Sequence, residues 1–164
     1  MDKISQGQNI HSSGVSGEVK IKTLLKEAGL SFVQKRLLKE GWGGRNRTSD
    51  CFIEQNSVRV WVEIKNYGGN PTKGYTGGTA NSEKYPGYAF EIVHGCYDKI
   101  IDAFVVCFSF TYPAVNHPNV NSAVRREMQK VKRLCEQVNS HEQNIKMFAC
   151  YDFELVELLT NITS

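Results

Sequence analysis

The segment Ser49–Asn66 constrains the fold of this chain more than any other, because its pattern predicts two paired β-strands. The first strand covers Asp50–Gln55, the second covers Val58–Lys65, and a two-residue turn, Asn56–Ser57, joins them. Two short runs of strand-forming residues separated by two turn-forming residues are typical of a β-hairpin. The chain is therefore expected to contain at least one antiparallel strand pair, against which its other elements must pack.

The side chains of the second strand alternate in character. Val62 and Ile64 are apolar, whereas Glu63 and Lys65 are charged. A strand sends alternate side chains to opposite faces of its sheet, so the two charged residues are expected to share one face. Asp50 lies on the neighbouring strand, where paired side chains can approach to about 5 Å. The hairpin therefore predicts two carboxylates and one ammonium group close together.

The rest of the chain predicts a mixed sheet with helices on both faces. The other expected strands cover residues 30–38, 100–110 and 145–151, and the expected helices cover residues 14–28, 88–99, 120–138 and a short segment after Asp152. The early consecutive strands predict antiparallel pairing, and the later strand, helix and strand predict a parallel crossover. The expected fold class is therefore α/β, with a mixed β-sheet of about five strands flanked by helices.

Length and composition fit a single domain spanning residues 1–164. Of the 164 residues, 40% are hydrophobic and 23% are charged, which is typical of a globular domain. Residues 1–12 are polar and are expected to be flexible. Residues 67–87 are rich in glycine and are expected to form a long loop insertion, and loops of that length are usually functional or mobile.

The apolar segments and the cysteines indicate a cytoplasmic protein without a membrane anchor. No apolar run approaches the roughly 20 residues that span a bilayer, and the N-terminus lacks the apolar core of a secretory signal. The five cysteines are odd in number and form no C-x-x-C motif, so buried free thiols in a reducing compartment are expected. The net charge of +3 permits a nucleic-acid partner but does not argue for one.

Two neighbouring carboxylates repel each other unless a positive charge lies between them. Mg²⁺ is a natural occupant, and Mn²⁺ can substitute, because Mg²⁺ takes oxygen ligands and commonly uses one or two carboxylates with phosphate and water. The expected metal ligands are Asp50, Glu63 and the carbonyl group of Ile64, while Lys65 could orient or activate an attacking water molecule. The alternative interpretation is a structural charge cluster on a half-exposed face of the sheet.

A further acid, Glu18, borders the apolar stripe of the expected helix 14–28. A carboxylate near a helix N-terminus is stabilised by the helix dipole, which is the simpler interpretation of this residue. The functional interpretation is that Glu18 points into the same site.

These residues, in this order, resemble the PD-(D/E)XK nuclease superfamily, which includes type II restriction endonucleases, Holliday junction resolvases and some homing endonucleases. In that family an acid-bearing helix precedes three strands, of which the second carries the motif aspartate and the third carries E-x-K. The resemblance implies a restriction-endonuclease-like core over roughly residues 14–110, with catalytic roles for Glu18, Asp50, Glu63 and Lys65.

Two features depart from the family pattern. Ser49 stands where the proline that gives the family its name would be, and residues 67–87 form an insertion that a minimal resolvase does not need. The insertion resembles the loops that restriction enzymes use against DNA. The expected activity is therefore Mg²⁺-dependent, sequence-specific cleavage of duplex DNA. One site per chain and two strands to cut predict a homodimer or a higher homo-oligomer.

Basic residues around the hairpin are candidates for DNA contacts, because phosphate groups attract Lys and Arg. The candidates are Lys35, Arg36, Arg45, Arg47, Lys73 and Lys84. The basic face of the expected helix 120–138 is instead interpreted as ordinary solvated surface. Two alternatives stay open: a Holliday junction resolvase or homing endonuclease of the same fold, and a non-catalytic DNA-binding subunit.

Overall fold

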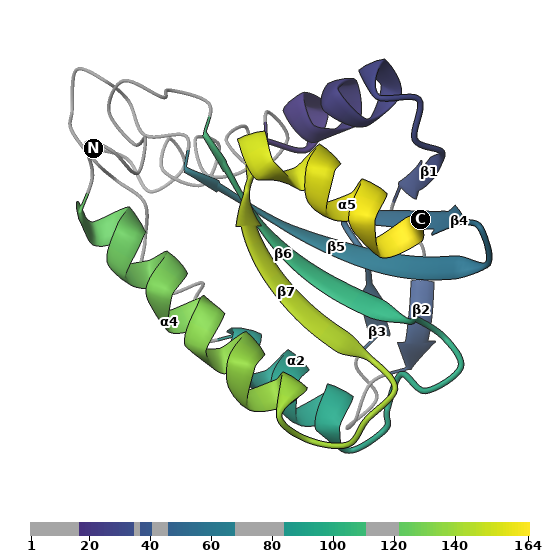
Figure 1. Cartoon of the computed structure of the whole chain (residues 1–164), viewed down its shortest axis with the longest axis vertical. Helices are drawn as coiled ribbons and strands as arrows, with labels where there is room; N and C mark the ends of the chain where they lie inside the picture. The colour runs from purple at the N-terminus through teal and green to yellow at the C-terminus, as the bar shows by residue number, and fades with distance from the viewer. Residues whose placement is uncertain (1–16, 35–36, 41–45, 68–83, 111–121) are drawn as a thin grey trace, which may run out of the picture.

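The structure is a computed structural model that describes residues 17–34, 37–40, 46–67, 84–110 and 122–164. Element labels follow Figure 1. The strands are β1 (Phe32–Gln34), β2 (Leu37–Glu40), β3 (Asn46–Thr48), β4 (Cys51–Gln55), β5 (Val58–Tyr67), β6 (Ala103–Phe110) and β7 (Lys146–Tyr151). The labelled helices are α2 (Lys84–Val93), α4 (Ser122–Asn139), the short 3-10 helix η2 (Asp152–Glu154) and α5 (Leu155–Thr163). Residues 17–27 are also helical.

The main sheet has five strands in the order β1-β4-β5-β6-β7. The β1–β4 and β4–β5 pairs are antiparallel, whereas the β5–β6 and β6–β7 pairs are parallel. The predicted mixed five-stranded sheet is confirmed. The parallel pairs arise because a helix precedes each of the last two strands and returns the chain to the end of the sheet where the previous strand began.

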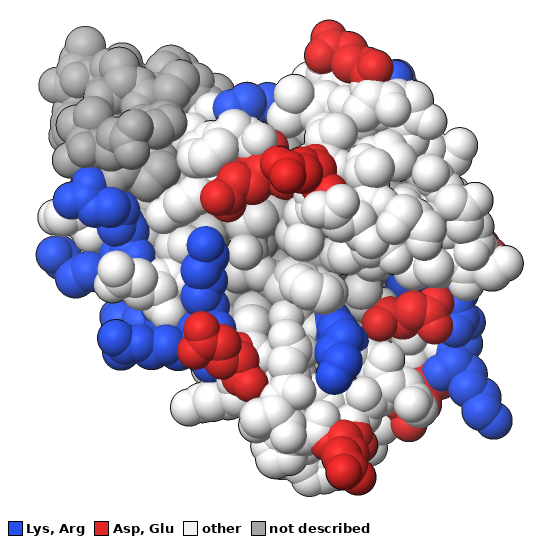
Figure 2. Space-filling model, viewed as in Figure 1, with Lys and Arg blue, Asp and Glu red and all other residues white. Residues whose placement is uncertain are grey.

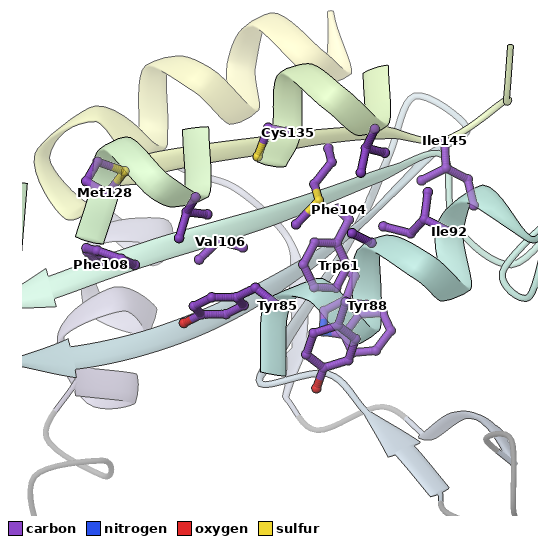
Figure 3. Packing of buried hydrophobic residues seen from close by; sticks show 14 of the residues in the cluster. Trp61, Tyr85, Tyr88, Ile92, Phe104, Val106, Phe108, Met128, Cys135 and Ile145 are labelled. Atoms are coloured by element: carbon purple, nitrogen blue, oxygen red, sulfur yellow. The ribbon is translucent and has the colours of Figure 1, made fainter. Parts of the chain in front are cut away.

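Helices cover both faces of this sheet (Figure 1). Helix 17–27 and α5 lie on one face, over a core that includes Ile21, Leu25, Val60, Val62, Val105, Leu155 and Leu159. Helices α2 and α4 lie on the other face, over a larger and more aromatic core (Figure 3) that includes Trp61, Tyr85, Tyr88, Phe104, Phe108, Val124 and Met128. The middle strand of the sheet, β5, contributes to both cores, so its side chains are buried on both sides.

The predicted hairpin is present as β4 and β5. Asn56 and Ser57 both have positive φ angles, 50° and 65°, as a type I′ turn requires. This turn pairs Gln55 with Val58 and sets the register of the rest of the hairpin. The short turn therefore fixes which residues of the two strands face each other.

Helix α2 begins earlier and ends earlier than the predicted helix 88–99. It begins at Lys84, because Pro86 falls in the first turn, where a missing backbone N–H costs nothing. It ends where Gly95 takes a φ of +72°, and the N–H of Cys96 then bonds to the carbonyl of Glu91 at 2.9 Å. The predicted loop 67–87 therefore extends too far, because residues 84–87 belong to α2. Residues 68–83 and residues 1–12 lie outside the described parts of the chain.

The predicted strand 30–38 is divided between two sheets. Its first part is β1 in the main sheet, and its last part is β2, which pairs with β3 in a separate two-stranded sheet. Residues 46–48, for which no strand was expected, therefore form β3. Strands of three or four residues carry too little periodicity to be recognised in a sequence. The other predicted elements agree with the structure to within three residues at their described ends.

All five cysteines are free and four of them are buried, as predicted. Among the described helices, none is long and apolar enough to cross a membrane.

Gly17 allows helix 17–27 to approach β5 closely. A Cβ atom added to Gly17 would lie 2.5 Å from the Cβ atom of Asn66, which is closer than such atoms can pack. Gly17→Ala is therefore expected to lower the free energy of unfolding by about 1–3 kcal/mol, measured by urea denaturation. Gly87→Ala is the control, because a Cβ atom there meets nothing within 4 Å and alanine favours a helix. An unchanged stability of Gly17→Ala would contradict this close approach.

Candidate functional site

The register of the hairpin places Asp50 opposite Glu63. Cys51 pairs with Val62 in the antiparallel ladder, so the residue before Cys51 faces the residue after Val62. The carboxylate of Asp50 also accepts a hydrogen bond of 2.8 Å from the backbone N–H of Ile64. Two of the predicted metal ligands, the side chains of Asp50 and Glu63, therefore lie near the start of β4 beside the backbone of Ile64, and the carbonyl group of Ile64 stays a predicted ligand.

Glu63 and Lys65 share a face of β5, as predicted, and this face lies under α2 and α4. Trp61, two residues before Glu63, belongs to the aromatic core on that side, whereas Val62 packs in the opposite core. Only 4% of Glu63 and 6% of Lys65 is exposed. The charged groups are thus buried, which differs from the half-exposed surface of the structural alternative. Burial of charged groups costs free energy that their partners must offset.

Glu63 is held by groups from two elements. The ammonium group of Lys84, at the start of α2, lies 2.5 Å from Oε1 of Glu63. The indole N–H of Trp61 donates to Oε2 at 3.3 Å, and the hydroxyl group of Tyr88 lies 3.5 Å from Oε1. Lys84, which was predicted to contact DNA, therefore provides the positive charge next to the buried carboxylate.

Asp50 is difficult to ionise in this environment. Burial is the main cause that raises its pKa from 3.8 to about 7, and the negative charge of Glu63 raises it further. The N–H of Ile64 and the ammonium group of Lys84 act in the opposite direction, while the charge of Glu18 adds slightly to the increase. A divalent cation between Asp50 and Glu63 would remove this repulsion.

The pKa of Lys65 is lower than that of an exposed lysine. Burial is the main cause that lowers its pKa, and the positive charge of Lys84 lowers it further, whereas Glu127 on α4 opposes both effects. The ammonium group lies 5.0 Å from the centre of the Tyr67 ring. A buried lysine with a lowered pKa is suited to accept a proton from water during a reaction.

Glu18 lies beside the site, near the start of helix 17–27. Its carboxylate accepts a hydrogen bond of 3.4 Å from Gln34 and lies 3.7 Å from the ammonium group of Lys22. The contact of Gly17 with Asn66 places the start of this helix next to the residue that follows Lys65. The electrostatic effect on Asp50 is consistent with this position.

Of the residues predicted to contact DNA, the structure describes only Arg47 and Lys84. Lys35, Arg36, Arg45 and Lys73 lie outside the described residues. Arg47 lies 2.5 Å from the carboxylate of Glu91 and 4.9 Å from the centre of the Tyr88 ring. This ion pair connects β3 to α2, so Arg47 has a stabilising contact within the protein. A contact between Arg47 and DNA stays a prediction.

Sequence reasoning missed two groups of this site. It did not pair Lys84 with Glu63, and it did not find Glu127, which is 6% exposed and forms an ion pair of 2.9 Å with Lys130. Glu127 could have been found, because it falls on the apolar stripe of its helix between Val124 and Val131. A glutamate at such a position needs a reason to be buried.

The donor set suits a hard cation. Asp50, Glu63 and the backbone of Ile64 offer oxygen atoms only, as Mg²⁺ prefers. Within the described ranges, no group of three or more His, Cys, Asp or Glu side chains could hold a metal ion. The predicted set contains two such side chains, so phosphate and water would have to complete the coordination.

Comparisons of this chain with protein-family models, with curated proteins and with solved structures found no significant match. The function is therefore inferred from the geometry and chemistry of the site itself.

The raised pKa of Asp50 predicts a measurable effect on stability. A carboxyl group whose pKa rises on folding stabilises the protein below its ordinary pKa of 3.8, and this contribution is lost as the pH rises to about 7. Asp50→Asn keeps an acceptor for the N–H of Ile64 and removes the charge. In chelator, the variant is expected to be more stable than the wild type above that pH, by about 1–3 kcal/mol.

Urea denaturation across this pH range tests the expectation. The advantage of Asp50→Asn should shrink as the pH falls toward 3.8. Glu157→Gln on α5 is the matched control, because Glu157 is exposed and lies on the opposite face of the sheet. If the wild type and Asp50→Asn show the same dependence on pH, folding does not raise the pKa of Asp50.

Proposed function

We propose that this protein is a Mg²⁺-dependent DNA endonuclease that hydrolyses phosphodiester bonds, and that its cleavage of duplex DNA is sequence-specific, as in restriction enzymes. The observation that carries the proposal is the proximity of two carboxylates, Asp50 directly before β4 and Glu63 on β5, with the buried Lys65 on the same face as Glu63. This arrangement costs stability, and ionisable groups with shifted pKa values cluster at functional sites. Fold stability alone gives no reason to bury them together.

The chemistry of each group follows from its surroundings. Asp50, Glu63 and the carbonyl group of Ile64 would hold Mg²⁺, which supplies charge stabilisation for a phosphate oxygen. Lys65, whose pKa is lowered by burial, would in its neutral form take a proton from the water molecule that attacks phosphorus. The ammonium ion so formed would face the negative charge that grows on the phosphate group. The P–O bond to the leaving sugar oxygen would break, and that oxygen would take a proton from solvent. Lys84 would move from Glu63 to a phosphate group when the cation binds.

The order of the elements supports the same proposal. Helix 17–27 precedes β1, β4 and β5, and α2 then leads to the parallel strand β6. This is the order that a restriction-endonuclease-like core would have, with the β2–β3 pair inserted between its first two strands. Glu18 lies on helix 17–27, Asp50 directly before β4, and Glu63 and Lys65 on β5, which supports the proposal because the resemblance implies the same order.

A cleavage assay tests the proposal. The protein should convert supercoiled plasmid to linear fragments with defined ends in Mg²⁺ or Mn²⁺, and the cleavage should stop in chelator. A parallel panel of linear duplex, four-way junction and single-stranded DNA separates sequence-specific cleavage from junction resolution. Sedimentation of the protein on DNA tests the homodimer that would cut both strands. Absence of cleavage of every substrate with both metals would contradict the proposal.

A second candidate is a non-catalytic DNA-binding subunit. The ion pair between Lys84 and Glu63 favours it, because an ammonium group already neutralises the carboxylate that a metal would need. Such a subunit would bind DNA without cleaving it and would bind no divalent cation, whether or not DNA is present. If the protein is such a subunit, Lys84→Met should still bind no metal. If it is a nuclease, Lys84→Met should bind divalent cation, because Glu63 would no longer be paired with an ammonium group.

A further inference from the structure

The excess positive charge of the chain is concentrated on one helix. Five Lys and Arg residues and two Glu residues give α4 a net charge of +3, which equals the net charge of the whole chain. One of the two glutamates, Glu127, is buried. All the basic residues of α4 are exposed: Arg125, Arg126, Lys130, Lys132 and Arg133. Blue side chains gather along this flank in Figure 2.

The exposed basic side chains lie on one side of α4 together with one exposed acid, Glu136, which is four residues after Lys132 and three after Arg133. Residues seven apart return to the same side of a helix after two turns, which aligns Arg125 with Lys132 and Arg126 with Arg133. Seven residues span about 10 Å, and one strand of B-DNA presents a phosphate group about every 3.4 Å along its axis, so this face could meet about three phosphates. The face keeps a net positive charge, because five exposed basic residues surround only one exposed acid.

One side of α4 borders the row of paired residues that crosses the sheet from Lys65 on β5 to Tyr151 on β7. Lys65 pairs with Phe108 of β6, and Phe108 pairs with Tyr151 of β7. Two strand spacings amount to about 10 Å. The ammonium group of Lys132 lies 6.0 Å from the centre of the Tyr151 ring, and the charge of Arg125 acts on the same tyrosine and lowers its pKa against the larger effect of burial. Arg125 and Lys132 therefore lie on the side of α4 that borders this row, whereas Arg126 and Arg133 lie on the outer side of the helix, opposite its buried residues.

An exposed aromatic ring lies beside the basic face. Phe153 is 59% exposed and stacks on Tyr151 at 5.3 Å with an angle of 22° between the rings. Two acids flank Phe153. Asp152 is buried and accepts hydrogen bonds from Lys20 and from the N–H of Phe110, and Glu154 accepts one of 2.9 Å from the N–H of Tyr151. Basic side chains next to an exposed ring are the combination that holds nucleic acid through phosphate groups and bases.

We propose that the exposed basic face of α4, together with Phe153, is a DNA-binding surface that carries the phosphate backbone past the row of Lys65. The proposal rests on the proposed function for the identity of the ligand, but its own support is the charge and the placement of this helix. It assigns a binding role to a face that the sequence pattern predicted to be ordinary surface.

Binding of the full chain to duplex DNA in chelator tests the surface without cleavage. The double variant R126Q/R133Q is compared with K26Q/K146Q, whose lysines are exposed on other elements; each pair removes two of the twenty basic residues. Glutamine and arginine have similar helix propensities, so α4 should be preserved. R126Q/R133Q is expected to weaken binding about tenfold and to reduce the slope of log K against log salt by about 2, since each lost phosphate contact contributes about 0.9.

The outcomes separate this surface from the enzyme activity. If R126Q/R133Q and K26Q/K146Q have the same affinity and salt slope, the surface is overturned, even if the wild type cleaves DNA. If only R126Q/R133Q loses binding while the wild type cleaves nothing, the surface stands and the endonuclease proposal fails. Phe153→Ala should weaken binding about tenfold, whereas Phe90→Ala, a second exposed ring, should not. If Phe153→Ala and Phe90→Ala have equal affinity for DNA, Phe153 is not part of the DNA-binding surface.

Discussion

Lys65→Met is expected to lower the rate of Mg²⁺-dependent DNA cleavage at least about 100-fold, because removal of one group that stabilises transition-state charge or transfers a proton has effects of that size. Methionine has a similar length and no charge, so it should fill the position of a side chain that is 6% exposed without leaving a cavity. The loss should appear in the rate under single-turnover conditions.

The variant must be shown to fold and to bind DNA. Circular dichroism and urea denaturation should give a native spectrum and a stability equal to or above that of the wild type, since a buried charge is removed. Lys26→Met, at an exposed position of helix 17–27, is the control and should cleave at the wild-type rate. If Lys65→Met also cleaves at that rate, Lys65 takes no part in the reaction.

Trp61→Ala is expected to destabilise the protein by about 3–5 kcal/mol, the usual cost of removing a large aromatic side chain from a core. Trp61 is fully buried, and its ring lies 5.2 Å from Tyr88, 5.2 Å from Tyr97 and 4.9 Å from Phe104, centre to centre (Figure 3). The substitution leaves a cavity between β5 and α2 and removes the N–H donor to Glu63.

Two further variants separate packing from the hydrogen bond. Trp61→Phe keeps most of the ring contacts and loses the N–H, so it should lose less stability than Trp61→Ala while loosening Glu63. Phe90→Ala is the control for a ring that is 49% exposed and should change the free energy of unfolding by less than about 0.5 kcal/mol. Urea denaturation measures all three. A loss for Trp61→Ala no larger than that for Phe90→Ala would contradict the packing of α2 against β5.

The hairpin and the face of its charges could be predicted from sequence because both follow from local rules. A two-residue turn fixes the register, and the register places Asp50 opposite Glu63. The alternation along β5 then places Lys65 on the same face. The mixed sheet was predictable for a similar reason, since parallel strands need a long connection and antiparallel strands do not.

The parts that could not be predicted depend on contacts between distant segments. Lys84 reaches Glu63 only because α2 folds back onto β5, and no local pattern records that contact. The β2–β3 pair is a tertiary pairing of very short strands, for which intrinsic strand preference is a weak guide. Glu127 approaches Lys65 only because α4 packs across the same face of the sheet.

Titration calorimetry with Mg²⁺ and Mn²⁺ tests the central claim most directly, since the claim is that Asp50 and Glu63 form a cation site. The wild type with DNA is expected to bind divalent cation, Asp50→Asn and Glu63→Gln are expected to lose that binding, and Glu157→Gln is expected to keep it. Metal binding should also lower the pKa of Asp50 and release a proton, so the measured heat should depend on the buffer. Absence of binding in the wild type, with and without DNA, or equal binding in Asp50→Asn, would contradict the claim.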